Sequence, residues 1–403
     1  MLDVNKIKKH FPFFEKNSDV CYLDSAASSL KCREVIEKMN DYYLYNGSNV
    51  HRGVYRLSYE ATELYEESRQ VIADFINAEF NEIVFTRGAS SALNLAALTY
   101  GMQNLKPGDE VITSELEHHS NNMPWEKVCE KTGAKLRYVK LDHEGRITID
   151  AFKEVLNNNT KVVAITHVSN VMGYISPIED IIKLAHDVNA IVVVDACQSA
   201  PHMKIDVKTL DCDFLAFSGH KMCGPNGVGV LYGKYSILKT LEPLEFGGDM
   251  AEDVNLYEST YKDAPYRFET GTPMIAEVIG LAEACKFLNN VGLDNIKAHE
   301  IKLKNLCIEK LKEINNVIIH NETSDTGVIA FNIKRVHPHD AASVFDEKNI
   351  CLRAGHHCAQ LITKWLKVPG TLRISFYIYN DESDVLKFIE TVKIASEFFS
   401  QFY

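Results

Sequence analysis

The sequence lacks the cysteine spacings that mark a disulfide framework or a zinc site. It holds ten cysteines among 403 residues, but no two of them form a C-x-x-C pair. Without such short paired spacings, the cysteines define neither a metal-binding knuckle nor a small cross-linked fold. We therefore expect most of them to be reduced and buried, as cysteines usually are inside intracellular proteins.

The sequence also lacks an excess of positive charge and any long apolar run. Lysine and arginine total 43 against 55 aspartates and glutamates, which gives a formal net charge of -12. Because nucleic-acid binding needs clustered cations, we expect no nucleic-acid partner. No run approaches the roughly 20 apolar residues of a membrane span, and the charged N-terminus does not resemble a secretory signal. We expect a cytoplasmic protein with no membrane partner, or an organellar one if a transit peptide has been removed.

What the sequence does contain is a series of short runs rich in valine and isoleucine, with helical patterns between them. The runs cover residues 83–87, 110–114, 162–168, 191–195, 214–218 and 229–232. Few polar residues interrupt them, which is typical of strands buried on both faces. Their alternation with helices predicts an α/β fold with a mainly parallel sheet.

The pattern changes in the last third of the chain. Two amphipathic helices, near 276–290 and 296–314, precede predicted strands near 327–333 and 371–379 and a final helix near 383–399. A chain of this length has room for two domains. We expect a large domain over 21–275, a smaller α+β domain over 276–403, and an arm over 1–20 that packs on the smaller domain.

Polar side chains collect where the predicted strands end. The segments are R-G-A-S (87–90), E-H-H (117–119), H-V-S-N (167–170), D-A-C-Q (195–198) and S-G-H-K (218–221). Ligands of an open parallel sheet bind beyond the carboxyl ends of its strands. The five segments together therefore predict one site with acidic, imidazole and amine groups at that edge.

Lys221 and Asp195 are the residues of this set that indicate a particular chemistry. A lysine is usually a solvated surface charge, but Lys221 follows an apolar strand and stands next to His220. An amine in a desolvated crevice can act as a Schiff-base nucleophile. Asp195 alone could be a metal ligand or a helix cap. Together with Lys221 it favours pyridoxal phosphate, whose protonated ring nitrogen a carboxylate can hold.

Two further residues have both a structural and a functional interpretation. Ser90 could simply cap a helix, or it could join the N–H groups of that helix in binding a phosphate. His118 could be an ordinary core histidine, or its flat ring could stack on an aromatic cofactor. The glycine-rich run 224–229 is not a dinucleotide fingerprint, because it does not connect a strand to a helix at the required spacing.

Longer motifs give the chain a resemblance to a known family. They include Y-L-D-S-A-A-S-S (22–29), N-V-H-R-G-V-Y-R-L-S (49–58), F-S-G-H-K-M-C-G-P-N-G-V-G (217–229), R-F-E-T-G-T-P (267–273) and L-R-A-G-H-H-C-A-Q (352–360). The chain resembles, nearly from end to end, the class V aminotransferases, and among them the type II (SufS-like) cysteine desulfurases. The resemblance implies the pyridoxal-phosphate-dependent transferase fold type I: a large domain with a mainly parallel seven-stranded sheet and a smaller C-terminal α+β domain.

The resemblance also implies a role for each matching residue. Lys221 would bond covalently to pyridoxal phosphate, Cys358 would take the sulfur, and His118 would stack on the ring and move protons. The remaining cofactor contacts would be Asp195 at the ring nitrogen, Gln198 at the phenolic oxygen, and Ser90, Ser218 and His220 at the phosphate, with Thr272 reaching the phosphate from the other subunit of a homodimer. Substrate would meet Asn170, Arg353 and Arg373 near its carboxylate, with His51 and Arg52 near the entrance. No metal site is implied.

Cys358, taken by itself, could be a metal ligand, a small buried hydrophobe or a nucleophile. The family reaction converts L-cysteine to L-alanine and leaves the sulfur on Cys358 as a persulfide. A thiolate is needed for this step, and Arg353, His356 and His357 are candidates for lowering the pKa of the thiol. The sequence does not choose among them.

The segment after Cys358 is short, since only 15 positions separate it from Arg373. Type II enzymes share this spacing, and a short loop cannot carry sulfur far, so an acceptor for iron–sulfur cluster assembly must come to it. In V-H-P-H-D (336–340), His339 matches a histidine that exchanges with a cysteine ligand on the zinc of SufU-like acceptors. This match implies a SufU-like partner rather than a SufE-like one. Alternatively, His337 and His339 only cap the helix that starts near Asp340.

Two other functions stay open. A selenocysteine lyase would use the same cofactor but would not need a nucleophilic cysteine to release selenium. A catalytically idle scaffold would only bind sulfur-transfer partners. The joint presence of Lys221, Asp195, His118 and Cys358 favours an enzyme, and we expect a cysteine desulfurase.

Overall fold

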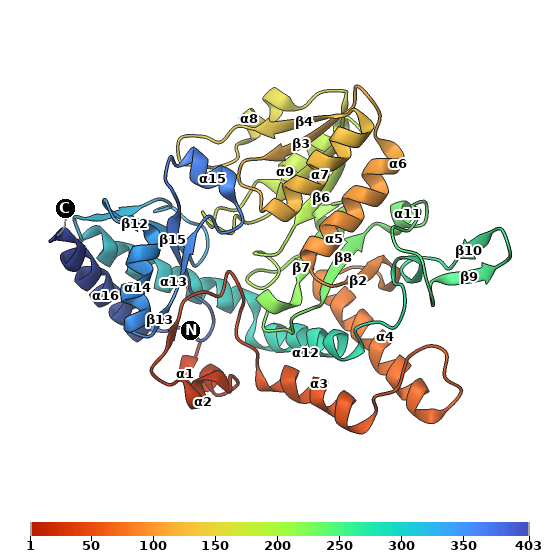
Figure 1. Ribbon diagram of the computed structural model, residues 1–403, viewed down its shortest axis with the longest axis horizontal. Helices are drawn as coiled ribbons and strands as arrows, with labels where there is room; N and C mark the ends of the chain where they lie inside the picture. The colour runs from red at the N-terminus through yellow and green to blue at the C-terminus, as the bar shows by residue number, and fades with distance from the viewer. Residues whose placement is uncertain (1, 402–403) are drawn as a thin grey trace.

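A seven-stranded sheet forms the centre of the larger part of the molecule in the computed structural model, which describes residues 2–401 (Figure 1). Its strands are β2 (Ile83–Thr86), β3 (Glu110–Ser114), β4 (Lys135–Val139), β5 (Thr160–Thr166), β6 (Ile191–Asp195), β7 (Phe214–Ser218) and β8 (Gly229–Gly233). Their order is β2-β8-β7-β6-β5-β3-β4, and only β8 runs antiparallel to its neighbours. The predicted α/β fold with a mainly parallel seven-stranded sheet is confirmed.

The six predicted apolar runs coincide with six of these strands because both faces of the sheet are covered. Every residue of β2, β3 and β7 is buried. The sequence pattern missed β4, K-L-R-Y-V, which lies at the sheet edge and exposes three of its five residues. An edge strand carries charged side chains that blunt its open side, so a search for apolar runs passes over it.

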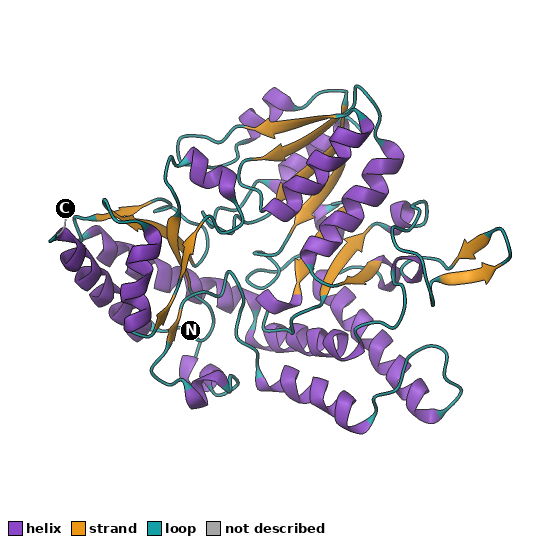
Figure 2. Ribbon diagram, viewed as in Figure 1, coloured by secondary structure: helices purple, strands orange, loops and turns teal. Residues whose placement is uncertain are grey.

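Helices cover both faces of this sheet, as Figure 2 shows. Phe214 and Ala216 of β7 join a core with α5 (Ala89–Ala96) and α7 (His119–Thr132). The alternate residues, Leu215 and Phe217, join the opposite core with α9 (Ile178–Asp187) and α12 (Ile275–Val291). This alternation follows from the two-residue period of a strand.

A second sheet, of four antiparallel strands, lies at the other end of the molecule. Its order is β11 (Val317–Ile319), β12 (Val328–Ile333), β15 (Thr371–Ser375) and β14 (Arg353–Gly355). It shares a core with α13 (Leu293–Lys312), α14 (Pro338–Glu347) and α16 (Glu382–Ser400). The predicted strand 371–379 ends earlier, at Ser375, because the chain then turns into a buried loop that includes Tyr377 and Tyr379.

Helix α12 differs from the prediction of an amphipathic helix. Eleven of its 17 residues are buried. It packs against α3 (Arg33–Tyr45) and α4 (Arg56–Ile76) and leads into α13. Little of its surface is therefore exposed, so it has no broad polar face. The proposed domain boundary at residue 275 stays a prediction, since α12 packs on elements that precede it.

The N-terminal segment lies against the C-terminal part of the chain. Phe11 meets Tyr379 edge-on at 4.9 Å, and Lys8 of α1 (Val4–Lys8) forms an ion pair of 2.8 Å with Asp381. The arm over residues 1–20 stays a prediction, and residue 1 and residues 402–403, the outer ends of the proposed domains, lie outside the described residues. Among residues 2–401, no helix is long and apolar enough to cross a membrane.

Candidate active site

A cavity of about 230 Å³ opens where the carboxyl ends of β6 and β7 meet the segment 353–373. It collects residues from the predicted strand ends and from the C-terminal part of the chain. Ten of the predicted site residues line it: Ser90, His118, Asn170, Asp195, Ser218, His220, Lys221, Arg353, Cys358 and Arg373. Among the described residues, no group of three or more His, Cys, Asp or Glu side chains could hold a metal ion.

Asp195 and Lys221 come into the cavity from neighbouring strands. Asp195 is the last residue of β6, is 4% exposed, and accepts a 3.0 Å hydrogen bond from the Cys197 N–H. Lys221 ends the short helical turn Gly219–Lys221 that directly follows β7. The same cavity thus holds a carboxylate that can pair with a pyridine nitrogen and an amine that can bond to an aldehyde.

The start of helix α5 forms the second end of the cavity. Gly88 is the N-cap of the helix and has φ +150°, a conformation that glycine adopts without strain. Because glycine has no side chain, it makes no capping hydrogen bond to the first turn. The Ala89 N–H donates to Ser218 Oγ at 2.8 Å, and the hydroxyls of Ser90 and Ser120 lie 2.6 Å apart. Hydroxyls and helix N–H groups at a positive helix end suit a phosphate.

Three buried polar atoms of the residues that line the cavity lack hydrogen-bond partners within the described part of the chain. One is His357 Nδ1, and the other two belong to predicted substrate contacts, Asn170 Oδ1 and Arg373 Nε. Because buried polar groups are normally paired, these atoms point to a polar ligand. The carboxylate of Asp195, the amine of Lys221, the hydroxyls at α5 and these two atoms together fit pyridoxal phosphate and an amino-acid substrate.

His118 lies at the start of α7 and combines both of its interpretations from the sequence. Its Nδ1 accepts a 3.1 Å hydrogen bond from the Ser120 N–H, which caps the helix, while the ring lines the cavity. Burial, reinforced by the charge of Lys221, lowers the pKa of His118 to about 4. The ring is therefore neutral at physiological pH.

Gln198 is a predicted cofactor contact that does not line the cavity. Its amide nitrogen donates to the Ala26 carbonyl at 2.7 Å, and the side chain is 3% exposed. It therefore ties the segment after β6 to the segment after β1 (Cys21–Tyr22). Its contact with a phenolic oxygen stays a prediction.

Cys358 sits on a loop with an unusual backbone. His357 and Cys358 both have positive φ values, +54° and +55°, which are uncommon for residues with a side chain. The loop is held at its carbonyls: Asn170 Nδ2 donates to the His357 oxygen and the His119 N–H to the Cys358 oxygen, both at 2.8 Å. The thiol itself is exposed at the cavity.

The structure narrows the choice of cations that act on Cys358. Burial lowers the pKa of His357 to about 2, and its Nε2 lies 2.8 Å from Thr371 Oγ1, so this ring is neutral. The His356 ring pairs with Thr363 Oγ1 at 2.9 Å. Arg353 and Arg373 line the cavity together with the thiol and carry permanent charges. Although burial lowers the pKa of Arg373 to about 10, it stays cationic at neutral pH.

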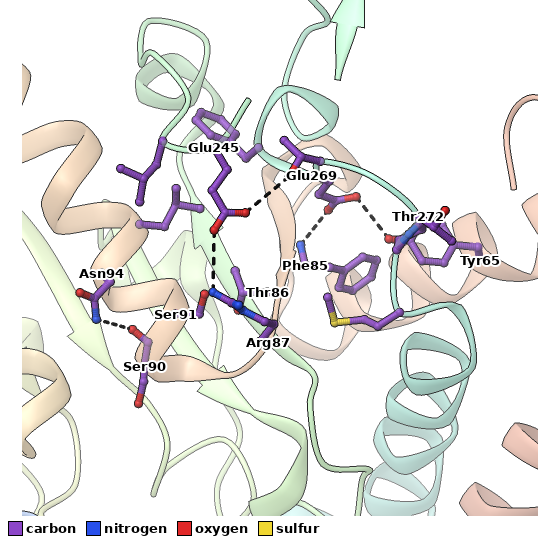
Figure 3. A pocket seen from close by; sticks show the side chains of 16 residues that line it. Tyr65, Phe85, Thr86, Arg87, Ser90, Ser91, Asn94, Glu245, Glu269 and Thr272 are labelled. Carbon is purple, nitrogen blue, oxygen red and sulfur yellow. Dashed lines mark hydrogen bonds and ion pairs between the residues drawn. The ribbon is translucent and has the colours of Figure 1, made fainter. Parts of the chain in front are cut away.

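His51, Arg52 and Thr272 lie away from Lys221. The His51 ring and the Arg52 guanidinium both bind Asp249, at 3.1 and 3.0 Å. Arg52 and Thr272 share a small pocket, and Thr272 also lines a larger cavity of about 580 Å³. Figure 3 shows Ser90 and Thr272 on opposite sides of that larger cavity. A single chain therefore does not bring these three residues to the cavity of Lys221.

The sequence interpretation missed Asp24, which binds both Arg353 and Arg373. It stands inside the motif Y-L-D-S-A-A-S-S (22–29), so the signal was present as an acidic residue within an otherwise apolar and small-residue run. Its role depends on the backbone bridge between Asp24 and Ser375, which connects positions far apart in the chain. No local pattern predicts that contact.

Comparison with known proteins agrees with this geometry. The sequence matches the aminotransferase class-V family over residues 21–388, and the chain belongs to that family of pyridoxal-phosphate-dependent enzymes.

Within the family, the similar proteins are cysteine desulfurases. A probable cysteine desulfurase of Halalkalibacterium halodurans is 48% identical over 100% of both chains, and one of Staphylococcus epidermidis is 45% identical over 99% of this chain and 98% of its own. The crystal structure of a cysteine desulfurase from Escherichia coli superimposes with a TM-score of 0.93 at 36% identity over 99% of each chain. The apo structure of one from Thermococcus onnurineus gives 0.94 at 41% identity over 98% of each chain. The chain is thus a member of the pyridoxal-phosphate-dependent cysteine desulfurases.

Proposed function

We propose that the protein converts L-cysteine to L-alanine, holds the removed sulfur as a persulfide on Cys358, and passes it to an acceptor for iron–sulfur cluster assembly. The observation that carries this proposal is that Lys221 and Cys358 line one cavity. Cys358 is also the exposed cysteine, whereas the other nine are buried or half-buried. The direct test is alanine and sulfide release from L-cysteine, with and without an acceptor protein.

The residues around Lys221 divide the work of holding the cofactor and moving a proton. Pyridoxal phosphate bound here would supply an electron sink for the charge that develops on the substrate α-carbon. Asp195 would hold the ring nitrogen, and Ser90, Ser218 and His220 would hold the phosphate. The Lys221 amine, which lines the cavity, would take the α-proton of the substrate.

Substrate orientation falls to Arg373, Arg353 and Asn170. The unpaired Arg373 Nε and Asn170 Oδ1 are buried polar atoms that a substrate carboxylate and amine would satisfy. The same two arginines line the cavity together with the Cys358 thiol, whose thiolate form is the nucleophile. The thiolate attacks the substrate sulfur: an S–S bond forms as the Cβ–S bond breaks, and the carbon keeps the bonding pair and takes a proton.

The positions of Thr272, His51 and Arg52 support a homodimer. If they serve a cavity of this type, it is that of a second copy, because in one chain they stand apart from Lys221. The hairpin of β9 (Ala251–Val254) and β10 (Ser259–Tyr261) projects from the body (Figure 1), and its tip residues Leu256 and Tyr257 are 91% and 98% exposed. Such exposed apolar side chains suit a subunit interface. The molar mass in solution tests this proposal.

His339 supports a zinc-containing acceptor of the SufU type. His337, not His339, is the N-cap of α14, since its Nδ1 accepts the His339 N–H at 3.3 Å. His339 is exposed, and its ring lies close to Gly355: a Cβ atom added to that glycine would be 3.5 Å from His339 Nε2. This places an imidazole near the start of the loop that carries Cys358. The capping alternative therefore applies to His337 alone.

Replacing His339 with alanine should lower turnover stimulated by a zinc-containing SufU-like protein by about tenfold, the effect of losing one metal-ligand interaction. Alanine release is measured over a range of acceptor concentrations, with turnover in the absence of acceptor as the reference. His337→Ala is the matched control: it removes the helix cap at a cost of about 1 kcal/mol in stability but leaves the response to acceptor intact. Stimulation of His339→Ala equal to that of the wild type would refute the partner assignment, and stimulation by a SufE-like protein alone would favour the other acceptor.

A further inference from the structure

The two arginines at the cavity lie next to each other on neighbouring strands of the smaller sheet. Arg353 of β14 and Arg373 of β15 are direct partners in the antiparallel register. Like charges at directly opposed positions repel each other. Arg373 is 2% exposed, so water does not screen its charge as it would at the surface. The pair needs a counter-ion to be stable in this position.

Asp24 is that counter-ion. Its Oδ2 lies 2.9 Å from Arg353 Nη2, and its Oδ1 lies 3.2 Å from Arg373 Nη2. The Arg353 Nε also approaches both oxygens at 3.2 Å. One carboxylate thus fixes two guanidinium groups: Arg353 contacts both of its oxygens, and Arg373 contacts Oδ1. The hydrogen bond from Arg373 Nη1 to the Asn170 carbonyl, at 2.9 Å, completes the position of the buried arginine.

The backbone holds Asp24 rigidly between the two parts of the molecule. Asp24 bridges to Ser375 in parallel, the Ser375 N–H donates to the Leu23 carbonyl at 2.8 Å, and the Ala26 N–H donates to Ser375 Oγ at 2.8 Å. Ser25 Oγ and the Tyr379 hydroxyl lie 2.6 Å apart. The carboxylate is therefore preorganised, and it does not need to be ordered when a ligand arrives.

The charges on this side of the cavity come mainly from these three side chains. The imidazoles of His118, His220 and His357 are neutral, because burial lowers their pKa values to about 4, 4 and 2. The remaining charged groups that line the cavity, Asp195 and Lys221, belong to the cofactor end. Apart from the Cys358 thiol, two arginines and one aspartate leave a net charge of one positive, which matches a single substrate carboxylate.

We propose that Asp24 is a positioning residue that sets this balance and so restricts the site to amino acids with one carboxylate. The proposal rests on the function proposed above, in which Arg353 and Arg373 receive the substrate carboxylate, and it deepens that function by naming what limits the substrate class. A second carboxylate on the substrate meets less positive charge, since the Asp24 carboxylate already pairs with both Arg353 and Arg373. Asp24 touches the arginines rather than the substrate.

The test compares the binding of L-alanine, which has one carboxylate, with that of L-aspartate, which has two. Each is titrated into the enzyme loaded with pyridoxal phosphate, and binding is followed by the change in visible absorbance of the cofactor. The wild type should bind L-alanine more tightly. In Asp24→Asn, which keeps the shape but removes the charge, the preference for L-alanine over L-aspartate should fall by about tenfold, the size of one altered ionic contact. An unchanged preference overturns the proposal.

The control and the second variant separate a charge effect from damage to the fold. Asp325→Asn removes a carboxylate that pairs with Arg146 at 2.7 Å outside the cavity, and it should leave the preference unchanged. Asp24→Glu keeps the charge but moves it, so both ligands should bind more weakly at the wild-type ratio. If Asp24→Asn does not fold, a ratio in Asp24→Glu that shifts towards L-aspartate overturns the proposal. Because binding is read without turnover, a wild type that shows the preference but forms no alanine from L-cysteine contradicts the proposed reaction and not the role of Asp24.

Discussion

Replacing Cys358 with alanine is expected to reduce alanine formation from L-cysteine by about a thousandfold or more, as the loss of a nucleophile does in other enzymes. The thiolate has no substitute in the cavity, since Cys197 is the other cysteine that lines it and its thiol is buried. Burial raises the pKa of Cys197 well above the usual value, so it stays a thiol. Alanine release under saturating L-cysteine, measured together with cofactor absorbance, checks the prediction.

Cys351→Ala is the matched control for this variant. Cys351 lies in β13 (Ile350–Cys351), is half-buried and does not line the cavity, so its loss should leave turnover near the wild-type value. The same Cys358→Ala protein should still release selenium from selenocysteine, because that reaction needs no sulfur-accepting thiol. Full activity of Cys358→Ala on L-cysteine would show that another group removes the sulfur.

Replacing Lys221 with alanine should lower kcat by about a hundredfold to ten-thousandfold, the usual contribution of a positioned proton-transfer group. The variant should also lose the covalent link to the cofactor while Asp195, Ser218 and His220 still hold it, so bound cofactor becomes removable by dialysis. Turnover, and the visible absorbance of the protein before and after dialysis, provide the two readouts.

Lys304→Met is a suitable control for Lys221→Ala. Lys304 is another lysine with little exposure, and it donates to the Ser324 carbonyl at 2.8 Å in a part of the chain that does not line the cavity. Its loss should affect stability and not the retention of cofactor. If Lys221→Ala keeps a dialysis-resistant cofactor and wild-type turnover, the assignment of Lys221 is wrong.

The large sheet could be predicted from the sequence to the extent that its strands are apolar on both faces. The buried runs of β2, β3, β6, β7 and β8 stand out by their content of valine, isoleucine and phenylalanine. The edge strand β4 was not predicted, because most of its residues are exposed and polar. Helix α12 was wrongly predicted to be amphipathic because local periodicity does not reveal that α3 and α4 pack against it. Both of these helices lie far from α12 in the sequence.

The candidate site divides in the same way. Asp195 and Lys221 converge because the strands that precede them are parallel neighbours, a relation that the alternating pattern predicts. Arg373 comes from a separate sheet and Cys358 from a loop that follows β14, and their assignment came from the family resemblance. The burial of His357 and the pairing of Asp24 with two arginines require the folded chain, since both depend on contacts between distant segments.

The most direct measurement of the proposed chemistry is mass spectrometry of the protein after incubation with L-cysteine in the absence of acceptor and reductant. The account predicts one added sulfur atom on the peptide that contains Cys358, formed with alanine in equal amount and removed when the acceptor is supplied. Cys358→Ala, treated in the same way, should carry no added sulfur on any of its nine remaining cysteines. Alanine formation with Cys358 unmodified, or with the added sulfur on Cys197 or Cys351, would contradict it.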